Sequence, residues 1–324
     1  MRKVRTGSAF KALAMGACIT LAVAACGGSN IKNTTTTNAG TTPCGTFNIA
    51  VNPWVGYEAD AYVVGDLAQT KLGCNVQYKN LSEEPSWAGF GTGAVDVVLE
   101  NWGHQDLIKK YIHTSNPTAE LAGQTGNIGV IGWFVPPWLA KAHPDITNWK
   151  NLNQYASHFV TSESGGKGQL LDGDPSYVTN DAALIKNLHL NYKVVVGGSE
   201  AALIQSFKSA EQNHTWLIAY FYSPQWFLNE VPLVKVNLPK YTPGCDNVPS
   251  KVACDYPLYH LNKVVSTTFA KSGSPAYSLV KKFHWTNKDQ NAVATYIAKD
   301  GMAPAAAAQK WIAANQSLVN SWLR

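Results

Sequence analysis

Apolar residues along positions 45–135 fall in short runs that alternate with stretches of helical spacing. The runs typical of buried strands are 47–51, 74–78, 95–100 and 129–135. The stretches of helical spacing between them are 56–72, 85–93 and 106–112. Strands that alternate with helices predict an α/β fold with a parallel sheet and crossover connections.

A second α/β pattern follows the first. Its expected strands are 159–161, 194–197 and 216–222, and its expected helices are 181–188 and 200–211. Two helical segments close the chain, one at 288–299 and one that begins at Pro304, where the missing N–H of proline costs nothing.

The two patterns predict two hinged lobes, the second inserted into the first. We expect lobe 1 at 45–135, lobe 2 at 136–224 and a return to lobe 1 at 225–324. Ligands in such folds bind between lobes, at the carboxyl ends of strands, so candidate site residues are those that follow strands.

The N-terminus has the organisation of a secretory signal. A basic start precedes the apolar stretch 12–25, which is too short to span a membrane. Its end, Val23-Ala24-Ala25-Cys26, resembles a bacterial lipobox, in which the cysteine is acylated and becomes the first residue of the mature protein. We therefore expect a signal peptide at 1–25 and an extracytoplasmic protein held to the cell membrane by lipidated Cys26; an ordinary cleaved signal is the alternative.

Residues 26–44 are rich in Thr, Asn and Gly and predict a flexible tether. Loss of the four basic residues of the leader lowers the net charge from +5 to +1. A nearly neutral chain argues against a nucleic-acid partner, which requires clustered positive charge. Eleven Trp and fourteen Tyr indicate instead that aromatic rings have a role in function.

Four cysteines remain in the body, an even number in an oxidising compartment, which indicates two disulfides. We favour Cys44 with Cys74, because each precedes one of two neighbouring strands, and Cys245 with Cys254, which flank one loop. The other pairings stay open. A zinc site is the rival interpretation, but no C-x-x-C pair occurs, and we expect no metal.

Four rings occupy positions where the cleft is expected. Trp54 and Trp102 follow strands, Tyr177 lies in a loop of the second lobe, and Tyr222 ends a strand. A cage of neutral rings suits a quaternary ammonium group, which gains about 0.5 to 2 kcal/mol per ring and has no N–H to donate. The alternative is that these rings are ordinary packing.

Polar candidates lie beside the rings. Backbone N–H groups of Gly56 and Tyr57, at a helix start, could bind a ligand carboxylate, although an ordinary strand-to-helix turn explains them as well. Glu100 shares strand parity with Trp102, and a position facing the cleft would favour a cationic ligand such as choline. His104 is a candidate rim residue. Glu83 and Glu84 are expected to be a solvated helix start or to form a salt-bridge contact with a permease.

Several segments together resemble the glycine betaine (OpuAC/ProX-like) substrate-binding proteins of ABC importers. These are NPWVGYEA at 52–59, PSWAG at 85–89, DVVLENW at 96–102 and AAAQKWIAAN at 306–315. The resemblance covers 45–324 and implies a two-lobed type II periplasmic-binding-protein fold, with an aromatic cage for the trimethylammonium group and backbone N–H groups for the carboxylate.

The resemblance assigns Trp102, Tyr177 and Tyr222 to the cage and the Gly56 and Tyr57 amides to the carboxylate. Tyr stands at 177 and 222, where relatives often have Trp, and Gln225 stands in a segment where some have His. The implied function is capture of glycine betaine, or of choline or carnitine, by a monomer that delivers it to an ABC permease and its ATPase.

That function involves no cofactor and no catalysis. An exported two-lobed hydrolase is the rival hypothesis, and it would need His104 with a serine of the second lobe. The sequence has no G-x-S-x-G or H-E-x-x-H motif to support that hypothesis. A purely adhesive surface lipoprotein is a further alternative, and it would have no small-molecule cleft.

Overall fold

The computed structural model describes residues 43–177 and 179–324. The predicted signal peptide, Cys26 and nearly all of the predicted tether lie outside the described residues. Within the described part, no helix is both long and apolar enough to cross a membrane.

One nine-stranded sheet forms the framework of the described chain, in the order β2-β1-β3-β9-β4-β7-β5-β6, with β8 paired to β4. The strands are β1 Thr46–Val51, β2 Asn75–Asn80, β3 Val97–Asn101, β4 Ala119–Val135, β5 Gly168–Asp172, β6 Tyr192–Val196, β7 Ala219–Ser223, β8 Val234–Lys235 and β9 Leu258–Ser266. We call β1–β3 the first half of the sheet and β5–β7 the second half. Within each half the paired strands are parallel.

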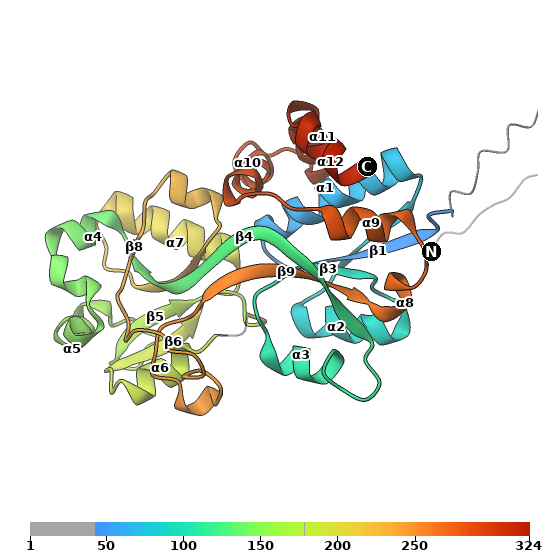
Figure 1. Ribbon diagram of the computed structural model, residues 1–324. Helices are drawn as coiled ribbons and strands as arrows, with labels where there is room; N and C mark the ends of the chain where they lie inside the picture. The colour runs from blue at the N-terminus through green and yellow to red at the C-terminus, as the bar shows by residue number, and fades with distance from the viewer. Residues whose placement is uncertain (1–42, 178) are drawn as a thin grey trace, which may run out of the picture. The chain divides into compact units, whose positions relative to one another are not determined.

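The two halves are joined by β4 and β9, which run antiparallel to each other across the molecule (Figure 1). β9 pairs with β3, and β4 pairs with β7, both antiparallel. The predicted parallel sheet is therefore confirmed within each half and wrong at the centre, where β4 and β9 run antiparallel to their neighbours. Only 129–135 of β4 had been predicted, because Gly123 and Gly126 interrupt the apolar pattern of its first part. Both glycines have positive φ and lie where the register of β4 against β9 shifts.

Strands β5, β8 and β9 were missed, and one predicted strand was wrong. Strand β5 had not been predicted, and the predicted strand 159–161 is a turn of 3-10 helix, Ala156–Phe159, followed by a single bridge from Val160 to Gly168. Strand β9 was missed because it mixes polar and apolar residues and buries Lys263 completely, so it has no clear alternation.

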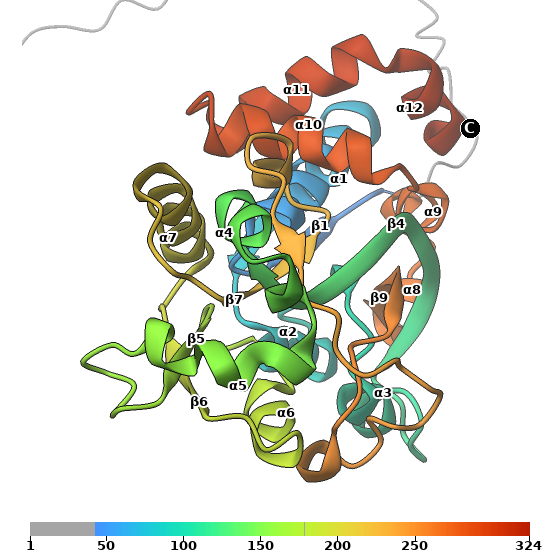
Figure 2. The same ribbon diagram turned by 90° about the vertical axis from the view of Figure 1, so that its left-hand side faces the viewer.

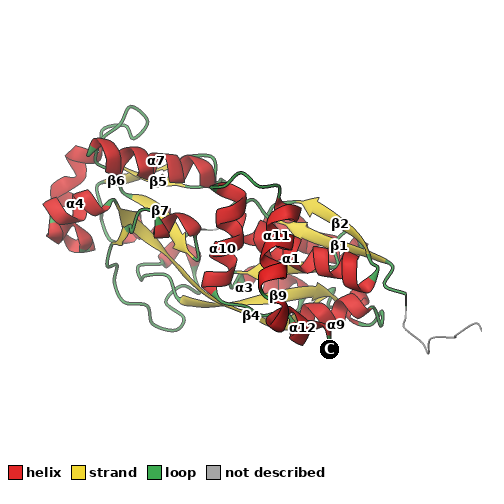
Figure 3. Cartoon of the chain, turned by 90° about the horizontal axis from the view of Figure 1, so that it is seen from above, coloured by secondary structure: helices red, strands yellow, loops and turns green. Residues whose placement is uncertain are grey.

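Helices cover both halves (Figures 1 and 3). With the first half lie α1 Val55–Leu72, α2 Glu83–Thr92, α3 Gln105–Tyr111, α8 Thr267–Ala270, α9 Pro275–Lys282, α10 Asn287–Ala298, α11 Pro304–Ala314 and α12 Gln316–Leu323. With the second half lie α4 Pro137–Ala142, α5 Leu152–Tyr155, α6 Asp181–Asn187 and α7 Glu200–Asn213. The predicted helices at 56–72, 181–188, 200–211 and 288–299 are confirmed within one or two residues at most ends.

The C-terminal helices pack over α1, which lies between them and the sheet (Figure 2). The last helix begins at Pro304 as predicted, but it ends at Ala314, and α12 follows after Asn315. This break lets Trp322 fold back onto Trp311, with ring centroids 6.1 Å apart and ring planes 12° from parallel. The core of the first half is thus closed by residues far from it in sequence.

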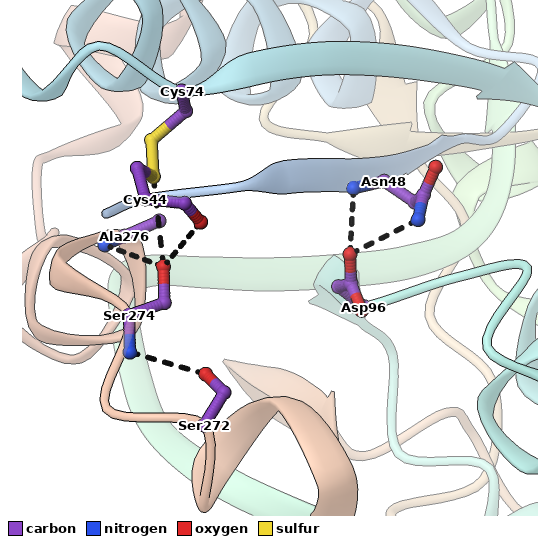
Figure 4. Close-up of a disulfide and its surroundings, with 7 residues drawn as sticks. All are labelled: Cys44, Asn48, Cys74, Asp96, Ser272, Ser274 and Ala276. Carbon is purple, nitrogen blue, oxygen red and sulfur yellow. Dashed lines mark hydrogen bonds between the residues drawn. A yellow bond between two sulfur atoms is a disulfide. The ribbon is translucent and has the colours of Figure 1, made fainter. Parts of the chain in front are cut away.

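Two disulfides join the pairs that the sequence analysis favoured, Cys44 with Cys74 and Cys245 with Cys254. The first lies where β1 and β2 begin side by side (Figure 4). The Ser274 hydroxyl donates to the carbonyl of Cys44 at 3.2 Å and accepts from the amide of Ala276 at 3.3 Å. The start of the body is therefore tied both to β2 and to the N-terminus of α9.

The lobe boundaries at 135 and 224 remain predictions. The segment between β8 and β9 contacts the second half: the Tyr256 hydroxyl donates to Asp181 at 2.7 Å, and the side-chain amide of Asn187 donates to the Val252 carbonyl at 2.9 Å. These contacts favour a return to the first lobe nearer Leu258, the first residue of β9.

Candidate functional site

A cavity of about 520 Å³ lies between the two halves of the sheet, and all four predicted rings line it. Trp54 stands between β1 and α1, and Trp102 directly follows β3. Tyr177 lies in the loop after β5, and Tyr222 is on β7. The expectation that these rings converge from both halves agrees with the geometry, while their contact with a ligand stays a prediction.

The rings meet edge to face. Centroids of Trp54 and Tyr177 are 6.0 Å apart, those of Tyr177 and Tyr222 6.5 Å, and those of Trp102 and Tyr222 5.8 Å. The ring planes of these pairs cross at 81°, 90° and 81°. Because perpendicular neighbours present their faces in different directions, the four rings form walls around a space rather than one flat stack.

Further tyrosines that the sequence analysis did not single out complete the wall: Tyr220, Tyr256 and Tyr259. Tyr220 lies 6.0 Å from Tyr177, and Tyr259 lies 5.7 Å from Trp102, between ring centroids. Period-two alternation along β7 could have found Tyr220, since it shares a face with Tyr222. Nothing in the sequence pointed to Tyr259, because its strand was not predicted.

Buried hydrogen bonds fix the orientation of the rings. The indole Nε1 of Trp54 donates to Glu100 Oε2 at 2.6 Å, and the hydroxyl of Tyr222 donates to Glu200 Oε1. The hydroxyl of Tyr177 donates to the Pro53 carbonyl at 3.2 Å, a contact between the two halves. Two carboxylates therefore hold two of the rings from behind.

Glu100 does not face the cavity, contrary to expectation. Its side chain is 1% exposed, lies behind Trp54 and accepts a second hydrogen bond from Gln290 Nε2 at 3.2 Å. Burial raises the pKa of Glu100 to about 7, although the bonds from Trp54 and Gln290 oppose the rise. The parity argument failed because the register of β3 against β9 shifts between Val98 and Asn101.

Neither Gly56 nor Tyr57 is among the residues that line the cavity. The Tyr57 hydroxyl accepts from the amide of Leu99 at 2.9 Å, and the Gly56 carbonyl accepts from Gln290 at 3.1 Å. The neighbouring amide at the start of α1, that of Val55, donates to Glu200 Oε2 at 3.0 Å. A protein carboxylate thus stands at this helix N-terminus.

His104 lines the cavity, as expected for a rim residue, and pairs with Glu83 at 2.7 Å between Nε2 and Oε1. Burial opposes protonation of His104, but the hydrogen bond and charge of Glu83 outweigh it and raise the pKa of the imidazole. The expectation of a solvated Glu83 was wrong, since the residue is buried. Gln225 is also buried, donates to Glu200, and does not line the cavity.

The cavity can bind and enclose a small ligand, but its described wall does not contain the serine that the hydrolase hypothesis requires. Among the described residues, its wall contains no serine, threonine or cysteine. His104 pairs with Glu83 and not with a serine. The site thus consists of aromatic rings, two carboxylates behind them and the His104–Glu83 pair. This arrangement suits the binding of a ligand.

Comparison with known proteins agrees with this. Residues 45–314 match the family model described as the substrate binding domain of ABC-type glycine betaine transport system. The trimethylamine N-oxide-binding protein of Pelagibacter ubique (strain HTCC1062) is 27% identical over 286 residues, which are 83% of this chain and 88% of that protein.

Two solved structures share the fold. Lactococcal OpuAC in its closed, liganded conformation with glycine betaine has a TM-score of 0.66 at 20% identity, covering 86% of this chain and 99% of that one. An ABC-transporter choline-binding protein in complex with choline has a TM-score of 0.70 at 18% identity, covering 86% and 92%. The predicted two-lobed periplasmic-binding-protein fold is therefore confirmed, and the chain belongs to the family of substrate-binding domains of ABC-type glycine betaine transport systems, which are extracytoplasmic binding proteins and not enzymes.

Proposed function

We propose that this protein captures a methylated ammonium solute in the cavity between its two halves and delivers it to an ABC permease. Convergence of Trp54, Trp102, Tyr177 and Tyr222 on one cavity is the observation that carries the proposal. A quaternary ammonium group cannot donate hydrogen bonds, so ring faces attract it better than they attract a primary amine, which would lose its bonds to water.

Glycine betaine, choline, carnitine and trimethylamine N-oxide are the candidate ligands. Each has a methylated nitrogen, and the names of the similar proteins include betaine, choline and trimethylamine N-oxide. The cavity of about 520 Å³ is within the range of small-molecule sites. We further propose that the receptor is a monomer, that lipidated Cys26 and the tether keep it at the membrane surface, and that an ATPase drives the permease.

Isothermal titration calorimetry on the mature chain tests the proposal. The panel contains glycine betaine, choline, carnitine, trimethylamine N-oxide and, as a negative control, L-lysine, which has primary amines. We expect one-to-one saturable binding of at least one methylated ligand, recovered unaltered, and none of L-lysine. The proposal is contradicted if no methylated ligand of the panel shows saturable binding. Chemical conversion of a ligand would support the hydrolase hypothesis instead.

A further inference from the structure

Glu200 joins the two halves of the molecule behind the wall of the cavity. It is the first residue of α7, in the second half, and it is 9% exposed. Its Oε2 accepts from the backbone amide of Val55, the first residue of α1 in the first half, at 3.0 Å. Its Oε1 accepts from the Tyr222 hydroxyl and from the side-chain amide of Gln225. All these donors surround one buried carboxylate.

This carboxylate stands where an anionic group of a ligand would be attracted. The first amides of a helix and its dipole favour negative charge, and Val55 directly follows the cavity residue Trp54. The carboxyl group of Glu200 already occupies this position, where it also accepts from the hydroxyl of a second cavity residue, Tyr222. A ligand carboxylate would have to displace Glu200 from Val55 or lie beside it, and like charges at short range repel.

Most of the other charged side chains at the site are acidic too. Glu83, Asp106 and Asp246 line the cavity, as do the cationic candidates Lys109 and His104. His104 is already paired with Glu83. Behind the wall, Glu100 bonds to Trp54 and Glu200 to Tyr222. Acidic groups therefore outnumber basic ones around the cavity. The faces of the rings in its wall also carry partial negative charge.

We infer that Glu200 is a specificity-determining residue, and that its carboxyl group makes the cavity select methylated ammonium solutes that carry no anionic group, such as choline, over glycine betaine. The inference rests on the proposed function, because it names the ligand class of the same cavity. It replaces the expectation that the amides of Gly56 and Tyr57 bind a ligand carboxylate.

Titration of the wild-type protein with choline, trimethylamine N-oxide and glycine betaine in one buffer is the first test. We expect choline to bind at least about tenfold better than glycine betaine. Glycine betaine binding equally well or better would overturn the inference but would leave the proposed function intact. Absence of binding by all three, and by carnitine, would overturn both.

Glu200→Gln tests the residue itself, because glutamine keeps the shape but removes the charge. The preference over glycine betaine is expected to fall by about tenfold or more in this variant. Glu163→Gln, at an exposed position away from the cavity, is the matched control and should keep the wild-type preference. An unchanged preference in Glu200→Gln would refute the role of Glu200, and the wild-type titration decides the ligand class even where the variant does not fold.

Discussion

The ring of Trp102 lies directly against the backbone of Gly129 on β4, so closely that a Cβ atom at position 129 would overlap the ring. Tyr177 has a similar support, since a Cβ at Gly173 would come within 2.8 Å of its ring. Two of the rings around the cavity thus rest on glycines, and their positions depend on residues that never touch the cavity.

Gly129→Ala is expected to push Trp102 out of position and to weaken binding of the preferred ligand by about tenfold or more, which corresponds to about 1.4 kcal/mol. Calorimetry measures the dissociation constant. Gly91→Ala is the matched control, because the nearest side chain to a Cβ there is Thr118 at an ordinary 3.4 Å. Equal affinities of the two variants would show that the contact with Gly129 does not position the ring.

Truncation of a cavity ring tests the proposed cage directly. Trp102→Ala should weaken ligand binding by about 1 to 3 kcal/mol, because both the ring face and its buried area are lost. Trp102→Phe retains a ring and should lose less. If Trp102→Ala has a native circular dichroism spectrum and an unchanged dissociation constant, Trp102 is not part of a cage.

The pH dependence of stability follows from the buried carboxyl groups. Burial raises the pKa of Glu100 and of Glu200 from 4.5 to about 7 in the folded protein. A carboxyl group with a raised folded pKa binds more protons in the folded state. Its favourable contribution is complete below about pH 4.5 and is lost as the pH rises through 7.

We therefore expect the melting temperature of the ligand-free protein to decrease between pH 5 and pH 8, as measured by differential scanning calorimetry. Glu200→Gln should reduce this slope. A bound cation favours the ionised carboxylates, so choline should bind more tightly at pH 8 than at pH 6. If the melting temperature instead rises over this interval in both the wild type and the variant, the raised pKa values of Glu100 and Glu200 are contradicted.

The two disulfides should differ in their contribution to stability. Cys44–Cys74 links residues 30 apart in sequence and Cys245–Cys254 residues 9 apart. Because a longer closed loop restricts the unfolded chain more, replacing the first pair by serine should lower the free energy of unfolding by about 2 to 4 kcal/mol, and replacing the second pair by less. Urea denaturation measures both, and the reverse order would contradict this model.

Attachment through Cys26 is testable in cells. Cys26→Ser should release the protein from the membrane fraction into the soluble fraction, because a single acylated cysteine is the proposed anchor. A variant with both Cys245 and Cys254 replaced by serine is the control and should stay in the membrane fraction. Retention of Cys26→Ser in that fraction would argue for another form of attachment.

Local chemistry sufficed for part of this site. Trp54 and Trp102 were found because each follows a predicted strand, and Tyr222 because it ends one, since in such folds the ends of strands meet at the cleft. Glu200 was missed, because only its position at the start of a helix is visible in the sequence, and its partner Val55 is 145 residues away. Glu100 was placed incorrectly because alternation cannot reveal a shift in register.

The sequence by itself determined the local elements, since apolar spacing, helix ends and cysteines beside strands depend on near neighbours. It predicted α1 and α7 and favoured the pairing of Cys44 with Cys74 in this way. Only the tertiary structure decided that β4 and β9 cross antiparallel between the halves, and that Glu200 meets Val55 and Tyr222. Such contacts depend on how distant segments pack against one another, and local spacing along the chain carries no record of that packing.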